Sequence, residues 1–160
     1  MESTPEMSIL KIEKAGSPVL KQICQPVGRV DGRLKTLLDD MADTMYKSNG
    51  IGLAAPQVGK NLRVVVIDVG DGLLEMINPV ITEREGSEID SEGCLSVPQI
   101  FGDVERAACV SVEYTTRFNK RKNLRAEKLL ARCIQHELDH LDGILFIDIA
   151  KSLRREEKEE

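Results

Sequence analysis

The sequence His136-Glu137-Leu138-Asp139-His140 constrains this chain more than any other feature, because it contains both of its histidines. An α-helix places side chains four residues apart on the same face. Two imidazoles in this arrangement can bind one metal ion, and Glu137 between them can act as a base on metal-bound water. The pattern therefore predicts a helix that carries a metallohydrolase site.

The alternative is a chance match on a surface helix whose histidines face solvent. The run over 129–134 argues against it, because this run is largely apolar and gives the helix a buried face. Four side chains fall near one stripe of that helix: Leu129, Cys133, His136 and His140. Gly143 offers a C-terminal stop, so we expect the helix over 126–141 with its histidines facing the core.

A catalytic zinc-type site uses three protein ligands, so the two histidines leave it one ligand short. A metzincin pattern is excluded, because Phe146 stands where its third histidine would be. A thermolysin-like site would take a downstream glutamate, and the candidates are Glu156, Glu157, Glu159 and Glu160. These lie in the charged tail over 151–160, which we expect to fray. Cys94 is the better third ligand, because a thiolate beside two imidazoles suits a first-row divalent metal.

The competing interpretation of Cys94 is a small buried side chain, a common fate of cysteine. We assign that role to Cys24, Cys109 and Cys133, which lie in or beside apolar runs. No two cysteines form a C-x-x-C pair, and the chain is not cysteine-dense. A zinc ribbon, a thioredoxin motif and a disulfide framework are therefore not expected.

The segment over 50–59, GIGLAAPQVG, is rich in small residues. A dinucleotide-binding loop of this kind needs a strand before it and a helix after it. Here the order is reversed, and Pro56 prevents a helix from starting inside the segment. Glycine and alanine instead allow a close approach of the backbone, and Gln57 offers an amide donor.

Three segments of the chain resemble the three motifs of peptide deformylase: GIGLAAPQ over 50–57, EGCLS over 92–96 and QHELDH over 135–140. They occur in the order and at the spacings of that family, and the similarity runs from about Ile9 to Ile149. The resemblance implies an α+β fold, a single domain with antiparallel or mixed sheets wrapped around the central helix that bears the metal motif. We divide the chain into an N-terminal extension (1–8), a catalytic domain (9–150) and the tail (151–160).

The resemblance implies that the chain removes the N-formyl group from the formylmethionine of newly made polypeptides and releases formate. Cys94, His136 and His140 would be the metal ligands, and Glu137 would pass a proton from water to the leaving amine. The resemblance assigns oxyanion stabilisation to the Leu95 backbone N–H and the Gln57 side chain. It also implies Fe²⁺ in the cell, whereas the ligands alone equally permit zinc, nickel or cobalt in purified protein.

The expected substrate contacts follow from the same resemblance. The peptide would lie extended along Gly50, Ile51 and Gly52. The methionine side chain would enter a pocket formed by Leu129, Cys133 and the His136 ring. Arg132 stands where some members of the family are apolar, so we expect an altered pocket mouth, with Ile89 as a further wall. We also predict that Glu92 pairs with Arg106 and clamps the loop that presents Cys94.

The remaining pattern is that of a mixed α and β chain. Asp31 is suited to cap a helix that runs to about Ser48. The segment over 62–69 predicts a buried strand, and the segment over 73–81 predicts another that breaks at Asn78-Pro79. Residues 110–114 alternate as a half-exposed strand.

Composition limits location and partners. The net charge of −5 argues against general affinity for nucleic acid. We also expect no specific DNA binding. No apolar run reaches the length of a membrane span, and the N-terminus lacks the features of a signal or transit peptide, so we expect a bacterial-type cytoplasmic protein. The stretch over 117–125 carries five basic residues. A transient ribosome contact would explain them, but we favour a solvated hairpin turn.

Two rival functions remain at this point. A general zinc peptidase would cleave internal peptide bonds and use a downstream glutamate ligand. A metal-stabilised binding module would leave Glu137 without a chemical role. Activity on a formylated peptide and on an internally cleavable peptide separates the three.

Overall fold

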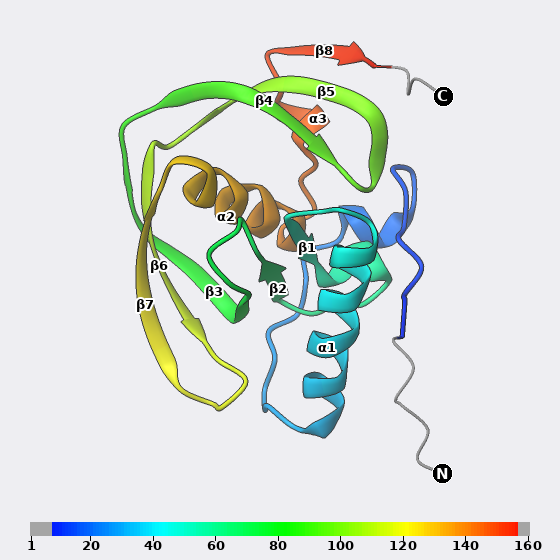
Figure 1. The fold of residues 1–160 in the computed structure, drawn as a ribbon, viewed down its shortest axis with the longest axis vertical. Helices are drawn as coiled ribbons and strands as arrows, with labels where there is room; N and C mark the ends of the chain where they lie inside the picture. Colours follow the sequence, from blue (N-terminus) through cyan, green and yellow to red (C-terminus); the bar gives the residue numbers. More distant parts are fainter. Residues whose placement is uncertain (1–7, 157–160) are drawn as a thin grey trace.

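The computed structural model describes residues 8–156, which form one α+β domain with two antiparallel sheets around helix α2 (Figure 1). The predicted fold class is confirmed. The helices are η1 (Pro18–Lys21), α1 (Gly32–Lys47), η2 (Ala55–Val58), α2 (Lys128–Leu141) and α3 (Phe146–Ile149). The strands are β1 (Gly52–Ala54), β2 (Val64–Ile67), β3 (Leu74–Glu85), β4 (Glu88–Cys94), β5 (Val97–Arg106), β6 (Cys109–Thr115), β7 (Arg121–Glu127) and β8 (Ser152–Arg155).

The first sheet has the strand order β1-β2-β3-β6-β7, and the second has the order β4-β5-β8. Every pairing between named strands is antiparallel. Figure 1 shows α2 in the middle of the molecule, with β3, β6 and β7 curving along one side and β4 and β5 arching over it. The motif that carries both histidines therefore lies at the centre of the fold.

Strand β2 is buried on both faces, in agreement with its unbroken apolar sequence. Val65 and Ile67 pack into the cluster that contains the apolar side of α2. Val64 and Val66 point the other way and pack with the buried stripe of α1. Successive side chains of a strand alternate between faces, so four residues join two cores. This strand holds α1 and α2 on opposite sides of the sheet.

Helix α1 begins and ends as the sequence predicts. The Asp31 side chain accepts a hydrogen bond from the Leu34 N–H at 3.0 Å, and Ser48 follows the last helical residue. Its buried side chains recur at helical spacing: Leu34, Leu38, Met41 and Met45.

Helix α2 begins at Lys128, two residues later than the expected start at Ala126. Ala126 instead belongs to β7, where it pairs with Val110 of β6. The backbone then turns at Lys128, whose φ of 56° lies in the left-handed region. Strand pairing thus competes successfully with helix formation at this end, and the predicted helix end at Leu141 is confirmed.

The predicted break at Asn78-Pro79 is wrong, because β3 continues through both residues. The strand accommodates them with a shift in its pairing with β6 between Ile77 and Val80. Asn78 has a φ of 51°, and its side chain both donates to the Val27 carbonyl and accepts from the Val27 N–H, each at 2.8 Å. These bonds replace ladder contacts and keep the strand intact.

The expected fraying of the tail over 151–160 is wrong for residues 152–155, which form β8 against β5. The Lys151 N–H donates to the Asp103 carbonyl at 2.8 Å, and the guanidinium of Arg154 lies 5.9 Å from the centre of the Phe101 ring. The edge of β5 supplies the backbone hydrogen-bond partners that allow residues 152–155 to form a strand. Residues 157–160, and residues 1–7 of the expected extension, lie outside the described residues.

The basic stretch over 117–125 is divided between the β6–β7 turn and β7 itself. The turn is closed by a hydrogen bond from the Thr116 N–H to the Lys120 carbonyl at 2.9 Å. Within residues 8–156, no helix combines the length and apolar character needed to cross a membrane.

Candidate metal centre

Three side chains that can bind a metal ion converge beside α2. Cys94 comes from the end of β4, and His136 and His140 come from successive turns of α2. Their donor atoms all lie within 4.8 Å of one another, and Cys94 Sγ lies 3.4 Å from His140 Nε2. Ligand atoms of a tetrahedral zinc-type site lie about 3.3–3.6 Å apart. The donor set and its spacing therefore fit one divalent cation.

The one downstream glutamate within the described residues does not join this group. Glu156 is the only one of the four within the described residues, and its N–H donates to the Gln99 carbonyl at 2.8 Å, next to β8. It is absent from the donor cluster found among residues 8–156.

Each histidine shows one feature of a metal ligand. His136 Nδ1 donates to Glu92 Oε1 at 2.8 Å, which leaves Nε2 to face the site. Burial lowers the pKa of His140 well below its usual value, so its imidazole is neutral. His140 Nδ1 is buried and has no hydrogen-bond partner among the described residues.

Glu92 is the centre of a buried ionic network. The predicted pair with Arg106 is present, and it is bidentate, with both nitrogen–oxygen distances at 2.9 Å. Arg132 Nη1 lies 2.6 Å from Glu92 Oε2, and Arg106 also contacts Asp139 at 2.5 Å. Burial by itself raises the pKa of Glu92, but hydrogen bonds from Arg106 and His136 outweigh it and lower the pKa to about 2. The carboxylate that orients His136 is therefore always charged near neutral pH.

The expectation that Arg132 alters the pocket mouth needs correction. Its guanidinium donates to Glu92, to the Val104 carbonyl at 2.9 Å and to the Glu88 carbonyl at 2.9 Å. The residue is only 8% exposed, and a buried guanidinium must be paired. Arg132 thus fastens α2 to β4 and β5.

Glu137 lies beside the donors and is almost fully buried. Its Oε1 has no hydrogen-bond partner among the described residues. Burial raises the pKa of Glu137 to about 7, with a counteracting contribution from the His136 charge. A carboxyl group with this pKa can both accept and release a proton near neutral pH.

The glycine-rich segment lies directly against α2. A Cβ at Gly52 would collide with the Glu137 carboxylate and would come within 2.8 Å of Cys133 Sγ. A Cβ at Gly50 would lie 2.8 Å from the Leu95 side chain. The predicted close approach of this backbone is therefore present, because Gly52 leaves room for the Glu137 carboxylate and the Cys133 thiol.

Gln57 lies on η2, next to Cys94. Its Oε1 accepts from the Ala54 N–H at 2.9 Å, and its Nε2 donates to Ser96 Oγ at 3.1 Å and lies 3.5 Å from Cys94 Sγ. The amide is thereby oriented with its N–H₂ group towards the thiol. The motif over 50–57 and the motif over 92–96 meet at this contact.

The predicted pocket residues divide into two groups. Cys133 is buried, and its thiol lies 3.7 Å from the Ile51 carbonyl. Leu129 is 50% exposed at the start of α2, and Ile89 is 57% exposed on β4. The structure therefore gathers Cys133, His136 and the glycine segment, and leaves the other two on the surface.

Three residues of the motifs have contacts at the site that the sequence did not predict: Ser96, Gln135 and Asp139. The Gln135 amide bonds to the N–H and the carbonyl of Ala107, each at 3.0 Å, which fixes α2 to the end of β5. The sequence provided no indication of these contacts. It did indicate that Arg132 would need a buried partner, because this charged residue lies one turn before His136 on the buried side of the helix.

Comparison with known proteins agrees with this geometry. The family model described as polypeptide deformylase matches residues 9–156. The peptide deformylase of Pelotomaculum thermopropionicum is 52% identical over 149 residues, which cover 93% of this chain and 96% of that protein. The peptide deformylase of Desulfitobacterium hafniense is 54% identical over 149 residues, or 93% and 99% of the two chains.

Solved structures agree as well. The crystal structure of peptide deformylase from Thermotoga maritima superposes with a TM-score of 0.88 at 41% identity and covers 90% of this chain and 99% of that one. The peptide deformylase from Synechococcus elongatus, solved in complex with actinonin, gives a TM-score of 0.88 at 42% identity and covers 95% and 84%. Since sequence, fold and donor cluster agree over nearly the whole chain, it belongs to the peptide deformylase family, the metal-dependent hydrolases that remove the N-formyl group from newly made polypeptides.

Proposed function

We propose that Cys94, His136 and His140 bind the single divalent cation of this deformylase, which is Fe²⁺ in the cell. Zinc, nickel or cobalt can replace it in purified protein, because the same ligands suit each of them. The convergence of the three donors carries the proposal. When bound, the cation supplies Lewis-acid polarisation of the formyl oxygen and lowers the pKa of a coordinated water molecule.

Glu137 is the proposed acid–base residue. Its Oε1 accepts the proton of the attacking water and then delivers it to the methionine nitrogen as the formyl carbon separates from that amine. Three observations support this role: the buried position, the pKa of about 7, and an Oε1 that no group in the described part of the chain hydrogen-bonds.

The proposed oxyanion donors are the Gln57 side-chain amide and the Leu95 backbone N–H. The Gln57 carbonyl is held by the Ala54 N–H, so the amide is oriented before substrate binds and needs no reorganisation during reaction. Loss of one such donor typically lowers the rate by about 100-fold or more.

The formylated peptide would lie along Gly50, Ile51 and Gly52. These residues adjoin or belong to β1, which is the last strand of its sheet among the described residues and so offers an edge for strand addition. The methionine side chain would lie beside Cys133 and the His136 ring, with Leu129 at the entrance. Arg132 would support this pocket from behind, through Glu92.

The direct test is formate release from formyl-Met-Ala-Ser by the iron-loaded protein, with an internally cleavable peptide assayed in parallel. Glu137→Ala should retain the metal and lose turnover, because only the proton transfer is removed. Cys94→Ala should lose metal affinity instead, as measured by metal analysis. Full activity of Glu137→Ala would overturn the acid–base role, and cleavage of the internal peptide would point to a general peptidase.

We infer a cytoplasmic location, since the substrates are chains emerging from bacterial-type ribosomes. The basic stretch over 117–125 is proposed to be a solvated hairpin without a specific ribosome contact. Its first basic residue, Arg117, is already paired with Glu75 and Asp39, each at 2.6 Å. Lys120→Glu combined with Lys122→Glu should leave co-sedimentation with ribosomes unchanged, and a loss of binding would assign an RNA contact instead.

A further inference from the structure

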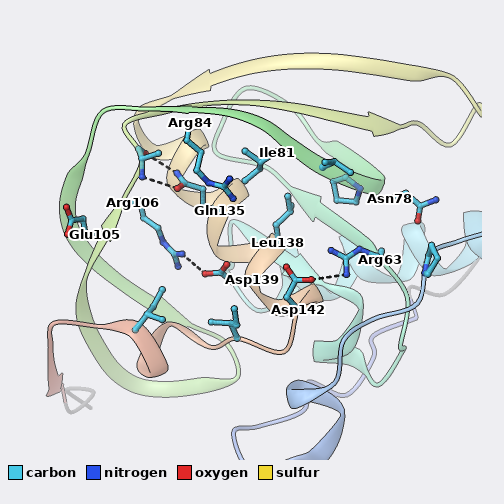
Figure 2. A pocket seen from close by; sticks show the side chains of 16 residues that line it. Arg63, Asn78, Ile81, Arg84, Glu105, Arg106, Gln135, Leu138, Asp139 and Asp142 are labelled. Carbon is cyan, nitrogen blue, oxygen red and sulfur yellow. Dashed lines mark hydrogen bonds and ion pairs between the residues drawn. The ribbon is translucent and has the colours of Figure 1, made fainter.

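A cavity of about 570 Å³ lies on the side of α2 that faces away from the metal ligands. Its walls come from β3, from the end of β5, from α2 and from the segment around α3 (Figure 2). Leu138, Asp139 and Asp142 of α2 line it, whereas His136 and His140 do not. Small-molecule pockets in proteins have similar volumes, about 300–1,000 Å³.

The cavity has an apolar wall that is partly exposed among the described residues. Six apolar residues contribute to it: Pro79, Val80, Ile81, Leu138, Ile144 and Ile149. Val80 is 52% exposed and Ile149 is 44% exposed, so part of this wall is in contact with solvent. An apolar body of a ligand would displace that solvent.

The polar groups of the cavity are engaged, with one exception. Asp142 pairs with Arg63 at 3.0 Å, Asp139 with Arg106 at 2.5 Å and Glu105 with Lys151 at 3.1 Å. The Gln135 amide is satisfied by backbone groups.

The exception is Arg84, an exposed residue of β3 that lines the cavity and whose side chain forms no ion pair or hydrogen bond with any residue over 8–156. Figure 2 shows it reaching from β3 towards α2. The cavity therefore presents one uncompensated guanidinium beside an apolar wall.

This arrangement selects the charge of a ligand. A carboxylate can form a bidentate pair with the free guanidinium. A multiply charged phosphate would be repelled more strongly than a carboxylate by Glu105, Asp139 and Asp142, which line the same cavity. A ligand that carries a single negative charge on a short apolar body therefore suits both the Arg84 guanidinium and the apolar wall.

The cavity also touches the network that orients the metal ligand. Arg106 lines the cavity, contacts Asp139 with Nη1, and donates through Nε and Nη2 to Glu92, which in turn accepts from His136. A carboxylate placed beside Arg106 competes with these partners for the same guanidinium. Three consecutive contacts thus connect the cavity to His136.

We propose that this cavity binds a small amphipathic carboxylate, with Arg84 on its head group and the apolar wall on its body. Binding of this ligand changes the rate at which the protein releases its metal, through the contacts that join Arg106, Glu92 and His136. The ligand is a fatty-acid-like or an acylated amino-acid-like molecule, since both carry the same head group on an apolar body.

The test measures binding of octanoate and of N-acetylleucine to the zinc-loaded, full-length protein by calorimetry. A peptide hydroxamate is present in excess, so that the catalytic cation is already occupied. Arg84→Gln should weaken binding about tenfold, because one charge-assisted pair is lost. Arg125→Gln is the matched control: this exposed arginine pairs with Glu85 outside the cavity, and its variant should bind as the wild type does.

Octanamide, which has the same body without the charge, should bind at least about tenfold more weakly than octanoate. The tighter of the two carboxylates identifies the class of ligand. Equal affinity of Arg84→Gln and wild type, loss of binding when the hydroxamate is present, or no binding of either carboxylate up to about 10 mM would overturn the site.

The connection to the metal is tested separately, by the rate at which zinc passes to a chelator. Saturating octanoate should change that rate in the wild type and leave it unchanged in Arg84→Gln. An identical rate with and without bound octanoate in the wild type would reject the connection.

Discussion

At the scale of single residues, this site depends on buried charges that each have a partner. Glu92 accepts hydrogen bonds from Arg106, Arg132 and His136, so neither the carboxylate nor the guanidinium groups are left unpaired in the interior. Glu137 is the contrast, because its Oε1 is buried and has no hydrogen-bond partner among residues 8–156. The motif spacing identifies Glu137, but the partner of Arg132 lies 40 residues away and only the fold brings them together.

Replacement of Arg132 by methionine should weaken the metal site. The substitution keeps much of the apolar stem but removes one guanidinium from Glu92, so the carboxylate holds His136 less firmly. We expect unfolding in urea to require about 2 kcal/mol less free energy, and zinc release to a chelator to be about tenfold faster. Arg154→Met, on the exposed β8, is the control. Unchanged zinc release in Arg132→Met would contradict the orienting role.

Glu92 should make the protein sensitive to acid. Its pKa is lowered from 4.5 to about 2 in the folded protein. A lowered pKa contributes stability that is complete above pH 4.5 and is lost as the pH falls towards 2. The shift corresponds to about 3 kcal/mol. Urea unfolding of wild type and Glu92→Gln should show a stability gap that narrows over this pH range. A stability difference that does not change with pH would show that the pKa of Glu92 is not lowered in the folded protein.

At the scale of elements, local signals succeed where a segment determines its own structure. Helix α1 starts at its capping aspartate, and β2 is buried on both faces as its apolar run indicates. Predictions fail where contacts with distant residues determine the structure of a segment. The first two residues of the expected metal helix pair with β6, β3 passes through Asn78-Pro79, and the tail becomes β8. For the helix start and the tail, hydrogen bonds to a neighbouring strand outweigh a local preference, whereas at Asn78 the hydrogen bonds to Val27 do so.

Removal of β8 should have a modest effect. All four of its residues are exposed, so it contributes backbone pairing and surface contacts but little apolar burial. A chain that ends at Ala150 should lose about 1–2 kcal/mol of unfolding free energy and still retain its metal. Hydrogen exchange of the β5 amides should become faster, whereas a chain that ends at Glu156 should match the full-length protein. Unfolding of the shortened chain at room temperature would show that β8 is part of the core structure.

At the scale of the whole molecule, the site is the meeting point of segments distant in the sequence. Gln57 lies on η2, Cys94 on β4 and His136 on α2, and three apolar clusters pack these elements together. A cation held by Cys94 and the two histidines would join the second sheet to the central helix. Metal binding should therefore stabilise the complete fold.

Chelation of the metal should lower the melting temperature. A cation present at about 1,000 times its dissociation constant stabilises the folded state by about 4 kcal/mol, which corresponds to roughly 10 °C for a domain of this size. Differential scanning calorimetry of the zinc-loaded protein with and without a chelator measures this change. Cys94→Ala should melt at the lower temperature in both conditions. A chelator effect of equal size in Cys94→Ala would show that the stabilising metal lies elsewhere.

The sequence by itself determined the chemistry of the site. Two histidines four residues apart, a glutamate between them, a cysteine in a glycine-flanked turn and a glycine segment that ends in Gln57 are all visible as residue types and spacings. The tertiary structure decided what surrounds them. It assigned Arg132 to Glu92 rather than to the pocket mouth, paired residues 152–155 of the tail with β5 and left Arg84, beside an apolar cavity, without a partner among residues 8–156. The physical reason is that buried charges and strand edges are satisfied by whichever groups the packed chain brings near, and sequence distance does not encode that proximity.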